Sequence, residues 1–283
     1  MAIENISDTA RWVAVYRAME TARPDAIFSD PFADRLGGQR GRDILDEMPQ
    51  GKAYAWPMIV RTAVFDEIIL DAVQNQKADL VVNLAAGLDA RPWRLPLPPS
   101  LHWVDVDLPG ILNYKTETLR QEKPVCRYEA VTTDLTDGEA RRALFSRLGA
   151  DASRALVISE GLLIYLQPEQ VGSLATDLRA QPSFKEWLID LASPQLLQRM
   201  EKTWGKKLAA SGSPFLFAPA ESTAFFKPYG WREGKFLSLW EEAQRLKRTM
   251  KGAWFWNLIG RFFPKKTREG VRRFSGLVVL ERE

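Results

Sequence analysis

Three acidic residues in this sequence each follow a short apolar run, in a position where a carboxylate can bind a ligand. They are Asp107, Asp134 and Glu160. If the runs are parallel strands, their carboxyl ends meet at one edge of a sheet, where such sheets bind ligands. Taken singly, each acid can equally be an ordinary helix cap. Together they predict a pocket rich in hydrogen-bond acceptors, suited to hydroxyl groups, an exocyclic amine and an ammonium group.

A single glycine, Gly87, follows an earlier apolar run at residues 81–84. Because it has no side chain, it lets the backbone turn tightly and lets a ligand approach closely. About 20 residues further on, Asp107 stands where a carboxylate can accept hydrogen bonds from ribose hydroxyls. Dinucleotide sites usually have three glycines against the pyrophosphate. One glycine therefore favours a nucleoside cofactor without phosphates, such as S-adenosylmethionine.

The apolar runs also predict the elements that position these residues. Strands are expected at residues 81–84, 101–107, 126–131, 155–158 and 187–191, with helices between them. Strands that alternate with helices indicate a doubly wound α/β fold with a parallel sheet. A further apolar run at 274–280 must join this sheet as its last strand.

The N-terminal region is expected to be helical. Ser7 can cap a first helix that runs to about Thr21, a second helix is expected at 31–36, and a polar loop should continue to residue 51. Apolar residues recur at helical spacing between 55 and 74. Arg61 lies off that apolar stripe, so it either projects into a site near the first strand or is a solvated surface arginine.

Composition sets limits on the class of protein. The chain has 283 residues, of which 46% are hydrophobic and 27% charged, so an ordinary globular fold is expected. A net charge of only +3 argues against a dedicated nucleic-acid binder. Cys126 is the single cysteine, which predicts a reduced, cytoplasmic protein with a half-buried thiol. No apolar run approaches the ~18 residues of a membrane span. Ten tryptophans suggest either an aromatic pocket or aromatic core packing.

Four motifs, in order and at fitting spacings, resemble those of the leucine carboxyl methyltransferase family. They are LAAGLDARPWRL at 84–95, VDVDLP at 104–109, Asp134 with Leu135, and SEGLLIYL at 159–166. Arg61 and the segment FSDPF at 28–32 also match. The resemblance covers residues 8–191 well and the remainder weakly. The bacterial branch of this family includes O-methyltransferases of the tetracenomycin polyketide type.

The resemblance implies a class I methyltransferase fold: a seven-stranded, mostly parallel, Rossmann-like sheet whose last strand is antiparallel, beside a short strand near 234–237. It implies a single domain over 1–283. Within it, 1–76 would form a helical N-terminal cap, 77–191 the cofactor-binding core, and 192–283 the substrate region, a helical lid insertion and the closing strands.

The resemblance also implies S-adenosylmethionine as cofactor, S-adenosylhomocysteine as product, and a set of cofactor-binding residues. These are Arg61, Ala85, Gly87, Asp107, Asp134, Leu135 and Glu160. Arg61 would pair with the methionine carboxylate of the cofactor, and Glu160 would face its amino group. Asp107 would hold the ribose hydroxyls, and Asp134 and Leu135 would surround the adenine.

The inventory of side chains favours an acceptor that needs no general base. A carboxylate is ionised at pH 7 and can attack an activated methyl group directly. The single histidine, His102, lies early in its strand, away from the carboxyl end, and no Cys/His grouping indicates a metal site. Tyr165 either orients the acceptor or is a packed tyrosine. We therefore expect O-methylation of a carboxylate, or a hydroxyl, on an apolar small-molecule acid of polyketide type.

Other functions stay open at this point. The chain could methylate the C-terminal carboxylate of a protein, or it could be a dehydrogenase-like α/β enzyme, since a fold does not fix a function. It could also bind a cofactor without catalysis. The sequence indicates neither the oligomeric state nor the identity of the acceptor.

The C-terminal third contains a basic, aromatic segment. Residues 245–273 hold ten Lys or Arg and one acid, Glu269, around the aromatic run 254–264. One hypothesis is a lid over an apolar acid. Another is a peripheral membrane contact through 251–266, since aromatic residues flanked by cations suit an anionic interface. A third is an ordinary amphipathic helix packed on the core.

Overall fold

The fold is built on a mixed sheet with helices on both faces. The computed structural model describes residues 6–48, 51–205, 214–250, 252 and 264–283. Within these residues the sheet has seven strands in the order β3-β2-β1-β4-β5-β7-β6. The strands are β1 Leu80–Leu84, β2 His102–Asp107, β3 Arg127–Thr132, β4 Ala155–Ser159, β5 Phe184–Ala192, β6 Trp231–Ser238 and β7 Ser275–Arg282.

Strand directions confirm the predicted architecture. The first five strands pair in parallel, while β7 is antiparallel to both β5 and β6. The chain runs outward through β1, β2 and β3 and then returns to place β4 beside β1. This reversal of strand order at β1 and β4 is the topological switch point at which doubly wound sheets bind ligands.

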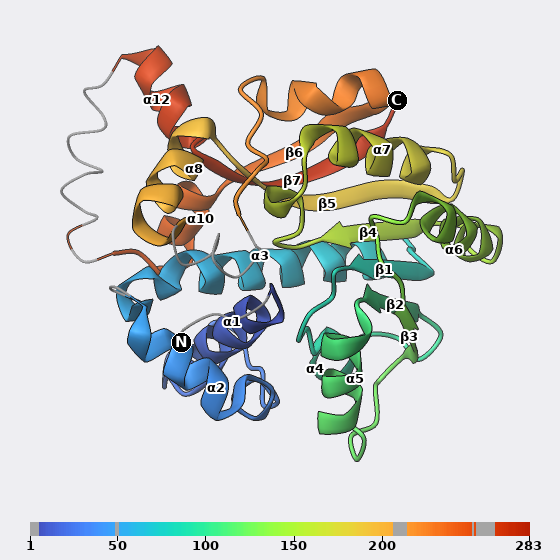
Figure 1. Cartoon of the computed structure of the whole chain (residues 1–283), viewed down its shortest axis with the longest axis horizontal. Helices are drawn as coiled ribbons and strands as arrows, with labels where there is room; N and C mark the ends of the chain where they lie inside the picture. Colours follow the sequence, from blue (N-terminus) through green and yellow to red (C-terminus); the bar gives the residue numbers. More distant parts are fainter. Residues whose placement is uncertain (1–5, 49–50, 206–213, 251, 253–263) are drawn as a thin grey trace.

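The two central strands, β1 and β4, are buried along their whole length. Figure 1 shows helices on both sides of the sheet. The helices α6 Gly138–Ala150 and α7 Pro168–Arg179 pack on one face, and α3 Ala55–Gln74 with α10 Leu239–Arg245 packs on the other. Burial on both faces explains why these strands read as continuous apolar runs rather than as alternating ones. Cys126 is buried in the α3 side of the core, deeper than the half-buried thiol predicted.

The N-terminal helices pack against α3, as Figure 1 shows. Helix α3 begins and ends where its apolar spacing predicts. Two other expectations are wrong. The first helix, α1 Ile6–Thr21, begins before Ser7, so Ser7 is not its cap. Residues 37–47, expected as a loop, belong to α2 Ala33–Glu47, which is kinked at Gly38 where φ is +60°.

The reason for the second error is tertiary packing. The polar half of α2 buries Gly41, Ile44 and Leu45 against α1 and its surroundings. A Cβ atom at Gly41 would lie 2.7 Å from the carbonyl oxygen of Arg11, so the two helices approach closely only because this residue is glycine. A polar, glycine-containing segment reads as a loop when the surface that it packs on is not visible.

The remaining elements are short and connect the sheet to its helices. They are η1 Gly51–Tyr54, α4 Arg91–Arg94, α5 Pro109–Thr118, η2 Leu163–Tyr165, α8 Pro194–Met200, η3 Glu201–Gly205, η4 Ser222–Tyr229 and α12 Lys265–Arg272. None of the described helices is long and apolar enough to cross a membrane. The aromatic run proposed above as a lid or membrane contact lies, up to residue 263, outside the described residues.

A buried ion pair between Lys115 and Asp105 contacts the glycine turn and stabilises it. Lys115 Nζ lies 2.6 Å from Asp105 Oδ2, and both side chains are fully buried. Lys115 also donates to the carbonyl oxygen of Asp89 in the turn. The other oxygen of Asp105 accepts hydrogen bonds from Asn83 and Trp103. Breaking such a pair leaves an uncompensated charge in the protein interior, which costs more than the pair contributes.

We therefore expect Lys115→Met to lower the free energy of unfolding by about 3–5 kcal/mol in urea denaturation. Lys123→Met, at an exposed position, is the matched control and should change stability by less than ~0.5 kcal/mol. The double variant with Asp105→Asn should recover part of the loss. Equal stability of Lys115→Met and the control would show that the pair is dispensable.

Candidate active site

A cavity of about 700 Å³ opens along the carboxyl edge of the sheet. This volume is typical of sites for small molecules and cofactors. All eight residues singled out from the sequence line it: Arg61, Ala85, Gly87, Asp107, Asp134, Leu135, Glu160 and Tyr165. The fold therefore brings together side chains that are up to 104 positions apart in the chain, from Arg61 to Tyr165.

The strand order arranges the cavity as a line. Asp107 and Asp134 follow β2 and β3 at one end, Gly87 and Glu160 follow β1 and β4 in the middle, and Asp190 lies near the end of β5. Neighbouring strands are ~4.8 Å apart, so β2 and β5 are separated by about 14 Å. A ligand of nucleoside length can span this distance along the edge.

The glycine turn and Asp107 form one hydrogen-bonded unit. Gly87 has a φ of +51° and donates its N–H to Asp107 Oδ2 at 2.6 Å, while the N–H of Leu108 reaches Oδ1 at 2.7 Å. Burial raises the pKa of Asp107, and these two backbone donors partly offset that rise. A Cβ atom at Gly87 would lie 3.2 Å from the Cβ of Ala10, so glycine also lets α1 close over the turn.

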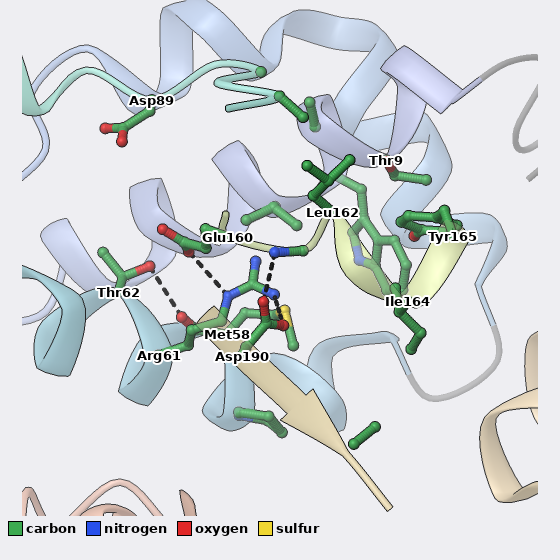
Figure 2. Close-up of a pocket in the computed structure, with 18 of the residues that line it drawn as sticks. Thr9, Met58, Arg61, Thr62, Asp89, Glu160, Leu162, Ile164, Tyr165 and Asp190 are labelled. Carbon is green, nitrogen blue, oxygen red and sulfur yellow. Dashed lines mark hydrogen bonds and ion pairs between the residues drawn. The ribbon is translucent and has the colours of Figure 1, made fainter. Parts of the chain in front are cut away.

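Arg61 points into the cavity and is only 12% exposed. It is therefore not the solvated surface arginine that the sequence left open. Its Nε donates to Glu160 Oε1 at 2.9 Å and its Nη1 to Asp190 Oδ2 at 3.1 Å, as Figure 2 shows. Glu160 in turn accepts from Arg91 Nη1 at 2.8 Å through its second oxygen. Glu160 thus lies between two arginines.

Sequence reasoning missed two charged members of this group, Arg91 and Asp190. Arg91 is buried, with ion pairs to Asp66, Asp89 and Glu160. Arg91 lies in the glycine motif, but the motif does not reveal its partners. Asp190 falls inside the apolar fifth strand, where the sequence pattern assigns it no role. A carboxylate within a buried strand was itself a signal, because such groups are rarely buried unless they are paired.

The wall next to Asp107 is formed by the loop after β3. Asp134 Oδ1 accepts hydrogen bonds from the N–H and the hydroxyl of Thr136, at 2.8 and 2.7 Å, and these bonds lower the pKa of Asp134. Leu135 is half-buried and packs on the core beside Asp134. The loop therefore presents one carboxylate and one apolar side chain to the end of the cavity.

Tyr165 lies close to Thr9 in the part of the cavity that Figure 2 shows. Its hydroxyl is hydrogen-bonded to Thr9, and its ring centroid is 5.7 Å from that of Phe215. Burial raises the pKa of Tyr165 to about 12. The phenol is therefore protonated at neutral pH, so it can hydrogen-bond an acceptor but cannot serve as a base.

His102 stands apart from the cavity, as its position early in β2 predicts. It contacts Glu129 on β3 at 3.0 Å, and burial lowers the pKa of its ring. In the part of the chain that the structure describes, no group of three His, Cys, Asp or Glu side chains could hold a metal ion. The described cavity therefore offers polar and ionic recognition rather than a neutral imidazole base.

The charge on Glu160 should stabilise the fold in a pH-dependent way. Burial alone would raise the pKa of Glu160, but Arg91 and Arg61 lower it below the usual value. A carboxyl group whose folded-state pKa is lowered contributes stability above its unfolded pKa of about 4.3, and loses it as pH falls through the folded value. We expect Glu160→Gln to cost about 3 kcal/mol at pH 7 in urea denaturation.

The difference between Glu160→Gln and the unsubstituted protein should shrink as pH falls below about 4. Glu67→Gln is the matched control, because Glu67 is half-exposed and pairs with Arg245 at the surface. That change should cost less than ~1 kcal/mol. A Glu160→Gln penalty that stays constant from pH 7 to pH 3 would contradict the ionic role of Glu160.

Comparisons with known proteins identify relatives of this chain. A protein of Mycolicibacterium gilvum is 35% identical over 188 residues, which make up 60% of this chain and 60% of that protein. A protein of Mycobacterium sp. (strain JLS) is 29% identical over 265 residues, 81% of this chain and 84% of that protein. Both carry the provisional name S-adenosyl-L-methionine-dependent methyltransferase.

Among solved structures, a provisionally assigned methyltransferase from Thermobifida fusca YX superposes with a TM-score of 0.59 at 15% identity, covering 100% of this chain and 96% of that one. This likeness shows that the two proteins share a fold. The family model for leucine carboxyl methyltransferases matches residues 10–179. That match spans more than half of the chain, from α1 to the end of α7, and includes the glycine turn, Asp107 and Glu160. The chain belongs to the leucine carboxyl methyltransferase family.

Proposed function

We propose that the protein transfers a methyl group from S-adenosylmethionine to a carboxylate oxygen of an apolar small-molecule acid. Methyltransferase activity and this cofactor follow from the family and from the named relatives. The observation that supports the cofactor here is the line of Asp107, Glu160 and Arg61 along one cavity. We further propose that the acceptor is an acid of polyketide type and that the protein belongs to the tetracenomycin-type branch of the family.

The side chains fit the chemistry of the cofactor from end to end. Asp107 already accepts one backbone N–H on each oxygen, and each oxygen has a further lone pair for a ribose hydroxyl. Arg61 suits the methionine carboxylate, because a guanidinium binds a carboxylate through parallel hydrogen bonds. Glu160 supplies negative charge for the ammonium group, and Asp134 with Leu135 forms a wall for the adenine.

The acceptor is expected in the part of the cavity where the lining is apolar. Aromatic and aliphatic side chains gather there from five parts of the chain: Trp12, Trp56, Met58, Ile164, Phe215 and Phe274. Such a surface favours an apolar body and excludes water, which would otherwise compete as a nucleophile.

Among the described residues, Arg199 brings a cation to this apolar part of the cavity. One side of α8 and of the following η3 lines the cavity. Its residues, which recur at helical spacing, are Leu196, Arg199, Met200 and Thr203. The guanidinium of Arg199 is 5.4 Å from the ring centroid of Phe274. No carboxylate among the described residues pairs with it, and the rest of the chain contains one acid, Glu4. Within the described residues this exposed cation has no acidic partner, which favours an anionic acceptor.

The residues present suit a reaction without a general base. When bound, the cofactor supplies a methyl group activated by its sulfonium. The chain has to hold an ionised carboxylate in line with that group and keep water away. Tyr165, protonated at neutral pH, can donate a hydrogen bond that orients the acceptor. We retain that role for Tyr165 as part of the proposal.

Asp107 gives a direct test of cofactor binding. We expect Asp107→Ala to weaken S-adenosylmethionine binding by about 10- to 150-fold in calorimetric titration, since it loses hydrogen bonds to a charged acceptor worth roughly 1.5–3 kcal/mol. Asp137→Ala is the control, because Asp137 caps α6 near the same edge without lining the cavity. Unchanged affinity in a folded Asp107→Ala protein would remove the ribose assignment.

The acceptor chemistry can be read from the stability of the product. We expect methyl-labelled S-adenosylmethionine to label apolar aromatic acids, and mild alkali to release the label as methanol, because methyl esters hydrolyse where methyl ethers do not. Arg61→Ala, which should bind the cofactor poorly, is the control. Alkali-stable label on matched phenols would favour a hydroxyl acceptor. Label on the C-termini of added peptides would favour protein methylation instead.

A further inference from the structure

Asp190 joins two parts of the site that no sequence motif connects. It lies near the carboxyl end of β5, opposite Leu277 of β7. Its Oδ1 accepts the backbone N–H of Gly161 at 2.7 Å, and its Oδ2 accepts Arg61 Nη1 at 3.1 Å. One carboxylate therefore ties the turn after β4 to the guanidinium that extends from α3 (Figure 2).

The turn that Asp190 holds is also the surface on which Arg61 lies. Gly161 has a φ of +68°, and a Cβ atom there would be 3.3 Å from Arg61 Nη1 and 3.6 Å from Nη2. The guanidinium thus lies directly against the backbone of this turn. Asp190 fixes both the position of the turn and the orientation of the guanidinium. One of its oxygens accepts the Gly161 N–H and the other accepts Arg61 Nη1.

This arrangement leaves one edge of Arg61 for a ligand. Nε is taken by Glu160 and one hydrogen of Nη1 by Asp190. Nη2 has no hydrogen-bond partner among the described residues, although the side chain is only 12% exposed and borders the cavity. Its two N–H donors are therefore available to a ligand in the cavity, and a carboxylate is the acceptor that a guanidinium binds most strongly.

We propose that Asp190 is a positioning residue that orients Arg61 to receive the carboxylate at the amino-acid end of the cofactor. This inference depends on the proposed function, because it assumes that an amino-acid group binds in this part of the cavity. Asp190 would then act through Arg61 and not through the ribose or the adenine, whose proposed partners Asp107 and Asp134 follow other strands.

The negative charge of Asp190 alone would not strengthen binding of the amino-acid end of the cofactor. The amino-acid end of the cofactor carries a carboxylate and an ammonium group, so its net charge is zero. Asp190 contacts Arg61, the proposed partner of the carboxylate, so removing its negative charge would by charge alone strengthen binding of the carboxylate and not weaken it. What remains is the loss of orientation: Arg61, held only through Nε, can rotate about its terminal torsions.

The test compares two ligands that differ only at the end that Asp190 is proposed to serve. S-adenosylhomocysteine has the amino-acid end, and 5′-methylthioadenosine lacks it. For Asp190→Asn, which keeps an oxygen for the Gly161 N–H, we expect the dissociation constant of S-adenosylhomocysteine to rise about 10-fold in calorimetric titration. That of 5′-methylthioadenosine should stay within about 2-fold.

Two further variants make the comparison specific. Asp190→Glu keeps the charge but moves the carboxylate by one methylene, so it should show the same selective loss. Glu186→Gln is the matched control, because Glu186 is an acid on the same strand that pairs with Arg154 outside the cavity. It should leave the affinity for both ligands unchanged.

A double-mutant cycle separates positioning from general stability. If Asp190 acts through Arg61, then Asp190→Asn should have no further effect on S-adenosylhomocysteine binding in an Arg61→Ala protein. Equal weakening of both ligands would overturn the proposal in favour of a structural role. Tighter binding of S-adenosylhomocysteine by Asp190→Asn would also overturn it, by showing that Asp190 competes with the ligand carboxylate. Failure of the unsubstituted protein to bind S-adenosylhomocysteine would reject the proposed function itself.

Discussion

The chain of alternating charges from Arg91 through Glu160 and Arg61 to Asp190 is the interaction on which the site depends. It joins the glycine motif, the turn after β4, helix α3 and strand β5, and all four groups are largely buried. Ions removed from water are tolerated only when each is paired and hydrogen-bonded. These elements therefore have to assemble together, and the cavity above them takes its shape from that requirement.

The same constraint divides the cavity into two chemical halves. From β2 to β5 the edge of the sheet carries carboxylates and arginines, which suit a polar cofactor. A second part of the lining comes from side chains of α1, α3, α8 and the segment before β7, and it is mostly apolar with Arg199 beside it. A methyl donor and an acceptor that meet at the boundary between the two parts would have the polar cofactor site on one side and an apolar surface that excludes water on the other.

Several features of this fold were predictable from local pattern. The doubly wound parallel sheet follows from the alternating apolar runs, the family resemblance implied the antiparallel β7, and α3 follows from its apolar spacing. The polar half of α2 was not predictable, because its glycines pack on α1 and not on its own neighbours in sequence. The tryptophans serve both as core residues and as pocket residues. Trp103 and Trp187 are buried in the core, while Trp12 lines the cavity.

The sequence by itself determined the type of sheet, the edge at which ligands bind, and the membership of Asp107, Glu160 and Arg61 in one site. Asp107 and Glu160 could be assigned because their motifs place them at strand ends, and Arg61, on α3, because the family resemblance includes it. Only the tertiary structure decided which charges pair. Asp190 and Arg61 are 129 positions apart, and neither residue type nor spacing reveals a partner over that distance. Pairing of buried ions is set by the packing of α3 against β4 and β5, and that packing exists only once the chain has folded.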